Sequence, residues 1–124
     1  MITHLRQVAL HVDDLERATA FYRDVIGLEL LARFDPPGLA FFALGETRLL
    51  LERGAPSSLL YLGVDDVRST VERLRDAGVQ IDSEPHVIHV DDAGQFGPAG
   101  EAEEMAFFRD SEGNLVGLSA RRRP

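Results

Sequence analysis

Two stretches of alternating apolar and polar residues, each followed by a helical pattern, organise the chain. Residues 7–12 and 59–64 alternate, which predicts half-buried strands, and each stretch ends in Asp-Asp. Aspartate at this position accepts hydrogen bonds from the first free N–H groups of a helix and complements the helix dipole. Residues 15–25 and 67–77 then carry apolar side chains at helical spacing, and a glycine follows each. The pattern therefore predicts, in two places, a strand followed by a helix that begins at an aspartate cap and ends at a glycine.

The second half of the chain repeats the first. The stretch "LHVDDLERATAFYRDVIGLEL" matches "LGVDDVRSTVERLRDAGVQI", and "AFF" occurs once in each half. Three extended segments follow each helix, near 28–34, 39–44 and 48–52 in the first copy and near 79–90, 104–109 and 114–119 in the second. The repeated unit is βαβββ, with module one at about 4–54 and module two at about 57–120 of a single domain spanning 1–124. One unit alone leaves an apolar sheet face open to water, so we expect the two to pair around a shared cavity.

The duplicated pattern, with "HVDDLERATAFYRDVIGLELL" and "MAFFRDSEGNLVGL", resembles the vicinal oxygen chelate superfamily of glyoxalases, bleomycin-resistance proteins and extradiol dioxygenases. The resemblance covers roughly residues 4 to 120. It implies an α+β fold in which two paired βαβββ modules form a curved mixed sheet around a cavity. It is specific for the fold and almost silent on the reaction.

In metal-using members of this superfamily, the first and last strands of each module supply the ligands of one divalent ion. The resemblance places these positions at Gln7, Leu50, Leu59 and Gly117. Only Gln7 offers a side-chain lone pair, whereas a divalent ion needs about three or four protein donors. We therefore expect no metal and no other cofactor, and the four positions become candidates for binding an organic ligand.

Strand periodicity adds further candidates beside these positions. His11 and Glu52 share the inward face with Gln7 and Leu50, and Tyr61 shares it with Leu59. His11 is either a hydrogen-bonded residue of the cavity wall or a general base or ligand anchor, with Glu52 as its partner, and the two are the catalytic candidates.

The adjacent phenylalanines near the end of module two must point to opposite faces of their strand. One of Phe107 and Phe108 therefore packs in the core while the other can touch a ligand. We assign the ligand contact to Phe108.

Two histidines lie beside a long acidic, glycine-containing stretch. Pro85 and the β-branched neighbours of His86 and His89 favour a strand, on which these two positions point to opposite faces unless a bulge intervenes. We expect one of them to face the cavity and keep both as ligand-binding candidates. Residues 91–104 are expected to form a loop, either a flap with Phe96 at its tip or a solvated connection.

The composition and net charge of the chain limit the classes of molecule that it is expected to bind. The 124 residues include 21 acidic and 13 basic side chains, a net charge of −8, which disfavours nucleic acid and anionic membranes. The basic run at 121–123 is expected to be a solvated end. The lack of cysteine excludes disulfides and thiolate ligands, and neither a membrane span nor a signal-peptide pattern is evident. We expect a cytoplasmic protein.

The leading hypothesis is a metal-independent small-molecule-binding protein, similar to the bleomycin-resistance branch, that sequesters a cytotoxic or aromatic compound as a homodimer. The alternative is a lyase, isomerase or dioxygenase-like enzyme with a displaced metal or acid/base centre around His11, Glu52 and His86 or His89. A sensor or fusion partner without catalysis is a third possibility. The sequence leaves open whether the protein is an enzyme.

Overall fold

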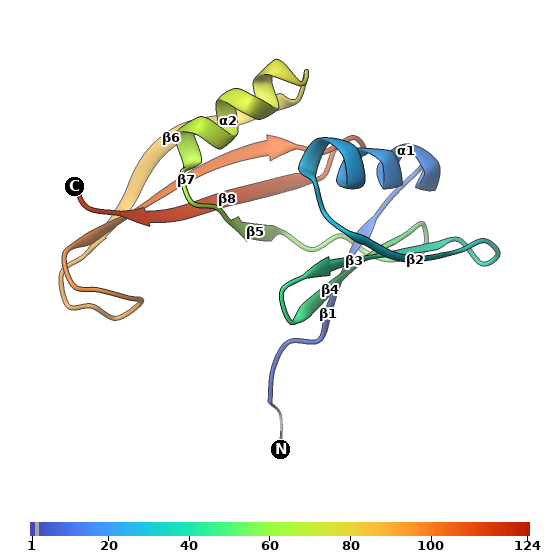
Figure 1. Ribbon diagram of the computed structural model, residues 1–124, viewed down its shortest axis with the longest axis horizontal. Coiled ribbons are helices and arrows are strands. Elements are labelled where there is room, and N and C mark those ends of the chain that lie inside the picture. The colour runs from blue at the N-terminus through green and yellow to red at the C-terminus, as the bar shows by residue number, and fades with distance from the viewer. Residues whose placement is uncertain (2) are drawn as a thin grey trace. The chain divides into compact units, whose positions relative to one another are not determined.

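The computed structural model describes Met1 and residues 3–124, which fall into two compact units. Unit 1 comprises Met1–Ser58 together with Asp110–Asn114, and unit 2 comprises Leu59–Arg109 together with Leu115–Pro124. Each unit contains one four-stranded sheet with a helix over one of its faces (Figure 1). We call the opposite face of each sheet its open face.

The strands of unit 1 form a mixed sheet in the order β1-β4-β3-β2. Strand β1 runs parallel to β4, and the other neighbours are antiparallel. The elements are β1 (Gln7–His11), α1 (Leu15–Ala20), the π-helical turn η1 (Phe21–Ile26), β2 (Leu30–Phe34), β3 (Leu39–Leu44) and β4 (Thr47–Glu52).

Helix α1 begins as the sequence pattern predicts. The side chain of Asp14 accepts a hydrogen bond of 3.0 Å from the Arg17 backbone N–H and so caps the first turn. The helix widens into η1 and ends at Gly27, whose φ of 88° is readily adopted only by glycine. The helix-facing side of the sheet forms a fully buried core with the helix: Leu10, Ala18, Tyr22, Phe42, Leu49 and Leu51.

A turn from much later in the sequence completes unit 1. The Tyr22 hydroxyl donates to Asp110 Oδ2 at 2.7 Å, and burial followed by the Asp110 charge raises the pKa of Tyr22 far above its usual range. The Glu112 side chain is fully buried and accepts hydrogen bonds from the backbone N–H groups of Asp13 and Asp14 at 2.8 and 2.9 Å. Arg17 also donates to it, from Nε at 2.8 Å. The turn at 110–114 thus fastens the start of α1.

The strands of unit 2 repeat the same arrangement, in the order β5-β8-β7-β6, with β5 parallel to β8. The elements are β5 (Leu60–Gly63), α2 (Val67–Asp76), β6 (Gln80–Asp91), β7 (Glu101–Arg109) and β8 (Leu115–Arg122). Asp66 caps α2 by accepting from the Arg68 backbone N–H at 3.2 Å. The core between α2 and the sheet is built from Val67, Val71, Leu74, Ala106, Phe108 and Val116.

The α+β fold of two βαβββ modules predicted from the sequence is confirmed. No helix among the described residues is long and apolar enough to cross a membrane.

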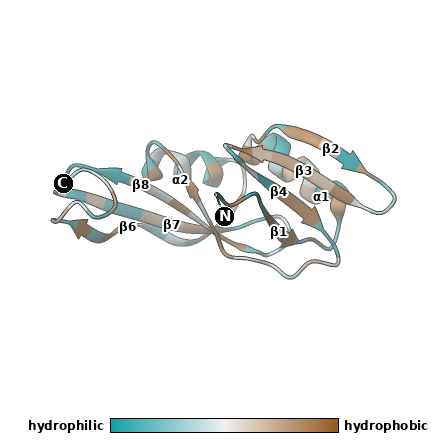
Figure 2. Ribbon diagram, turned by 90° about the horizontal axis from the view of Figure 1, so that it is seen from below, coloured by the Kyte–Doolittle hydropathy of each residue, from teal (hydrophilic) through white to brown (hydrophobic). Residues whose placement is uncertain are grey.

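The end of the chain differs from expectation. Figure 2 shows the last part of β8 as hydrophilic, yet this part is paired rather than a loose tail. Arg121 lies 3.0 Å from Asp91 and Arg122 lies 3.3 Å from Glu104, and both carboxylates are 1% exposed. Arg121 and Arg122 extend β8 because β6 and β7 supply buried acids.

Candidate ligand-binding site

The open face of unit 2 carries an aromatic pair that closes over a glycine. Tyr61, Gly117 and Phe107 face one another on β5, β8 and β7. The rings of Tyr61 and Phe107 meet edge to face with centroids 5.9 Å apart. A Cβ atom at Gly117 would lie 2.9 Å from Tyr61 Cδ1 and 3.0 Å from Phe107 Cε2, closer than such atoms pack. The rings occupy this place because residue 117 has no side chain.

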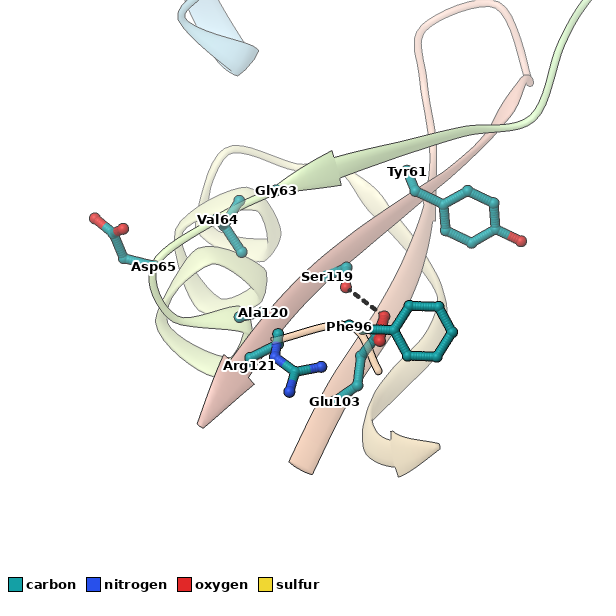
Figure 3. Close-up of a pocket in the computed structure, with 9 residues that line it drawn as sticks. All are labelled: Tyr61, Gly63, Val64, Asp65, Phe96, Glu103, Ser119, Ala120 and Arg121. Atoms are coloured by element: carbon teal, nitrogen blue, oxygen red, sulfur yellow. Dashed lines mark hydrogen bonds between the residues drawn. The ribbon is translucent and has the colours of Figure 1, made fainter. Parts of the chain in front are cut away.

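Next to this pair lies a shallow cavity of about 540 Å³, which we call the aromatic hollow. Its lining comes entirely from unit 2: Tyr61, Gly63, Val64, Asp65, Phe96, Glu103, Ser119, Ala120 and Arg121. Tyr61 and Phe96 are 53% and 72% exposed, so both rings are accessible. In Figure 3 the two rings project in the same direction, beside the hydrogen bond that Ser119 Oγ donates to Glu103 Oε2 at 3.1 Å. Exposed aromatic rings beside a few polar groups suit the binding of a flat organic molecule.

Phe96 is held in place by the loop that carries it. Asp91 accepts hydrogen bonds from the backbone N–H groups of Gln95 and Phe96 at 2.8 and 2.9 Å. These bonds, Phe96 first, lower the pKa of Asp91 to about 2. The Phe96 ring also meets the His89 ring edge to face, with centroids 6.3 Å apart.

Arg121 fastens the same loop from β8. It donates to Asp91 Oδ2 at 3.0 Å and to the Pro98 carbonyl at 3.1 Å, and to Glu101 Oε1 at 3.1 Å. Gly97 lies against the guanidinium so closely that a Cβ there would be 2.7 Å from Arg121 Nε. The connection is shorter than predicted, because β7 begins at Glu101, and it is built around a buried carboxylate and an arginine.

The open face of unit 1 is arranged differently around Gln7, which alone among the four metal-ligand positions given by the resemblance has a side-chain donor atom. Gln7 Oε1 accepts a hydrogen bond of 3.1 Å from Arg48 Nε, and the Arg48 guanidinium lies 5.8 Å from the centre of the Phe41 ring. Leu50, the other mapped position of this unit, stands between Ala9 and Phe41 and is 8% exposed. A guanidinium already bound to Gln7 opposes a metal cation at the same oxygen.

Both ring nitrogens of His11 are engaged within unit 1. Nδ1 lies 2.8 Å from the Arg53 carbonyl oxygen and Nε2 lies 2.9 Å from Asp13 Oδ1. Both oxygens are acceptors, so the geometry favours the imidazolium, in which both nitrogens donate. The Asp13 hydrogen bond, followed by that of Arg53, accordingly raises the pKa of His11, although desolvation opposes the shift. Glu52 is the strand neighbour of His11 in β4, so the two catalytic candidates share a face.

A β-bulge changes the expected orientation of the two histidines of β6. His86 pairs with Met105 and His89 pairs with Glu103, and the register shifts between Val87 and His89. Because Met105 and Glu103 are two residues apart on β7, both histidines lie on the open face. His86 Nδ1 is 2.8 Å from the Glu84 carbonyl oxygen. The prediction that they point to opposite faces is wrong, since single-sequence parity does not reveal the extra residue.

Two other candidates are placed differently from expectation. Phe108 is fully buried on the helix-facing side, and Phe107 is the member of the pair that reaches the open face. Leu59 precedes β5 and is 48% exposed. Phe96, Phe107, Glu103 and Ser119 were not among the predicted ligand-binding residues. The alternation of neighbours along a strand is a sequence signal for Phe107 and for Ser119, and the predicted flap has Phe96 at its tip; Glu103 carries no such signal.

Within the described part of the chain, no three His, Asp or Glu side chains group so that they could hold a metal ion. His86 and His89 share a face of unit 2, and His11 and Glu52 share a face of unit 1. Each pair by itself offers fewer protein donors than a stable divalent site uses.

Comparison with known proteins places these features in context. The sequence profile of the Glyoxalase/Bleomycin resistance protein/Dioxygenase superfamily matches residues 4–118. The uncharacterized protein YraH of Bacillus subtilis is 28% identical over 130 residues, covering 90% of this chain and 94% of YraH. A probable lactoylglutathione lyase of Synechocystis is 30% identical, over 65% of this chain and 75% of that protein. The crystal structure of TnmS3, an antibiotic-binding protein from Streptomyces, superposes with a TM-score of 0.73 at 28% identity, covering 98% of each chain.

Proposed function

The chain belongs to the Glyoxalase/Bleomycin resistance protein/Dioxygenase superfamily, and we propose that it is a metal-independent member that binds a small aromatic molecule in the aromatic hollow. The observation that carries this proposal is the Tyr61–Phe107 pair over Gly117. By resemblance, position 117 is where metal-using members have a side chain that coordinates the metal ion. Here the absence of a side chain leaves room for two rings, which form an apolar surface beside the hollow.

Three further observations support binding without a metal. Gln7 is hydrogen-bonded to Arg48, Leu50 is nearly buried between apolar neighbours, and the Cβ space of Gly117 is taken by rings. The structural likeness to TnmS3, described as an antibiotic-binding protein, supports a role in which the ligand is held rather than transformed.

The rival function, an enzyme with a displaced acid/base centre, depends on His11. A general base needs a ring nitrogen with a free lone pair, and both nitrogens of His11 are engaged by acceptors that favour the charged ring. We therefore propose a structural role for His11 in unit 1. Turnover that disappears in His11→Ala, with an intact fold, would contradict this assignment.

The test is binding of a neutral aromatic probe, 1-naphthylmethanol, followed by fluorescence. The chain has no tryptophan, so the naphthyl signal is free of indole emission. Gly117→Ala should weaken binding about tenfold, because the new methyl group must push the two rings apart. Gly54→Ala is the matched control, since its Cβ would meet only Glu52 Oε1 at an ordinary 3.6 Å.

Metal analysis completes this test. We expect the purified protein to bind the probe without metal and to show no change in affinity after chelator treatment. Stoichiometric Zn, Ni, Mn, Co or Fe, together with loss of probe binding on chelation, would contradict a metal-independent site.

A homodimer and a cytoplasmic location, both expected from the sequence, stay predictions. Exposed apolar side chains on the strands, including Phe34 in unit 1 and Tyr61 in unit 2, support self-association. Light scattering that gives the mass of one chain at all concentrations tested would contradict the dimer.

A further inference from the structure

We propose that the aromatic hollow selects planar aromatic molecules that carry a positive charge. This selectivity rests on the ligand site proposed above and adds the chemical class of the ligand. It follows from the balance of charged groups around the hollow and from the exposed rings within it.

The first step is the unpaired acid of the hollow. Glu103 stands on the open face of β7, and its carboxylate accepts a hydrogen bond from Ser119 Oγ. Among the described residues, no Lys, Arg or His side chain forms an ion pair with Glu103 or with Asp65, the second acid of the lining. Their negative charges are therefore available to a ligand.

The second step is the one positive group of the lining. Arg121 lies 3.0 Å from Asp91 and 3.1 Å from Glu101, and its side chain is only 21% exposed. Two carboxylates thus compensate one guanidinium, which leaves the surroundings of the hollow negative. An anionic ligand would meet this excess of acids without a free cation to receive it.

The third step is the aromatic surface. The exposed rings of Tyr61 and Phe96 offer π faces to a ligand. A π face attracts a cation through the ring quadrupole, and it also stacks with a flat ring system. A planar aromatic cation satisfies both the rings and the acids, whereas a neutral aromatic molecule satisfies only the rings.

The experiment compares three probes with the same ring system and different charge: 1-naphthylmethylammonium, 1-naphthylmethanol and 1-naphthoate. At pH 7 and low salt, we expect the ammonium probe to bind about fivefold more tightly than the alcohol, and the naphthoate to bind most weakly. The preference should shrink as the ionic strength rises, because exposed charges are screened.

The diagnostic variant is Glu103→Gln, which keeps an oxygen for Ser119 and removes the charge. It should lower the affinity ratio of the ammonium probe to the alcohol to about twofold or less. The matched control is Glu46→Gln, an exposed residue of unit 1 that changes the net charge equally and should leave the ratio unchanged.

The outcomes separate the two proposals. Equal binding of all three probes, or tighter binding of naphthoate, would overturn the charge selectivity while leaving the aromatic site intact. If none of the probes binds, the proposed function fails as well. A third outcome is that no probe binds and that Tyr61→Ala has a lower oligomeric mass than the unchanged chain. The hollow would then be a contact between copies of the chain.

Discussion

The two units share one topology and one helix-facing core, but their open faces differ at equivalent places. In unit 1 the middle residues across β1, β4 and β3 are Ala9, Leu50 and Phe41. In unit 2 the corresponding residues across β5, β8 and β7 are Tyr61, Gly117 and Phe107. Both units have a phenylalanine on the third of these strands. In unit 1 the other large side chain is Leu50 on the last strand, whereas in unit 2 it is Tyr61 on the first strand.

The charges differ as well. Unit 1 places Arg48 over Phe41, bound to Gln7, whereas unit 2 places Glu103 beside its rings. The helix-facing cores remain alike, with Phe42 and Phe108 both fully buried. A duplicated sheet can therefore keep the packing that folds it while its other face acquires new chemistry. This separation is possible because alternate residues of a strand belong to different faces.

The largest difference that mutation should reveal concerns the helices. Both helices are capped by an aspartate, Asp14 in α1 and Asp66 in α2, but the start of α1 is also held by hydrogen bonds to the Glu112 side chain. Glu112→Gln should lower the free energy of unfolding by about 3 kcal/mol, since charge-assisted hydrogen bonds to Arg17 and two backbone N–H groups are weakened. Urea unfolding measures the change. The control, Glu72→Gln on α2, removes an exposed carboxylate and should cost under about 0.5 kcal/mol.

Lowering the pH should also weaken the hydrogen bonds between Glu112 and the start of α1. Desolvation raises the pKa of Glu112, but hydrogen bonds from Arg17 and then the Asp14 and Asp13 N–H groups outweigh it and lower the pKa to about 2. A carboxyl with a lowered folded-state pKa stabilises the fold above its unfolded value, 4.5, and loses this contribution as pH falls toward 2. Stability should therefore fall through this window, with Asp91 adding in the same direction.

The variant Glu112→Gln is a control for the predicted loss of stability at low pH. Glu112→Gln cannot titrate at this position, so its stability should fall less steeply between pH 4.5 and 2 than that of the unchanged chain. Parallel pH curves for the two proteins would show that Glu112 contributes nothing to the acid limb.

A smaller effect is expected where the loop of unit 2 meets Arg121. Gly97→Ala brings a methyl group against the guanidinium and should shift the loop that positions Phe96. We expect binding of 1-naphthylmethanol to weaken about threefold, with little change in overall stability. The control is again Gly54→Ala. Unchanged probe affinity would mean that Phe96 does not contribute to binding.

The smallest effect concerns His11 in unit 1. Proton NMR should give a His11 pKa above 6.5, and Asp13→Asn should lower it because the charged acceptor is removed. A raised pKa stabilises the fold below the unfolded value, and this contribution is lost as pH rises through the folded value. A pKa that is insensitive to Asp13→Asn would show that the hydrogen bond to Nε2 does not persist in solution.

Much of the fold could be predicted because its signals are local and occur twice. The Val-Asp-Asp stretches mark a strand end and a helix cap, and Gly27 and Gly78 mark the helix ends with φ near 88° and 87°. Strand alternation also predicts Tyr61 as a residue of the site, but it does not predict Glu103 or Arg121 of the hollow. The bulge at 87–89 has no single-sequence signature, and it places His86 and His89 on the same face of β6.

Other parts of the site depend on contacts between distant residues. Arg121 belongs to a strand because Asp91 and Glu101 lie beside it, and neither partner is adjacent in sequence. Gly117 was recognised as a residue that cannot bind a cation. Its effect on Tyr61 and Phe107 depends on contacts across three strands, which a single sequence does not show.

The crowding at Gly117 also limits how this protein could change. A carboxylate introduced there would point into the rings of Tyr61 and Phe107, so it could not reach an ion until both had been replaced or moved. Placing a metal ligand at this position would therefore take coordinated substitutions on three strands rather than a single mutation.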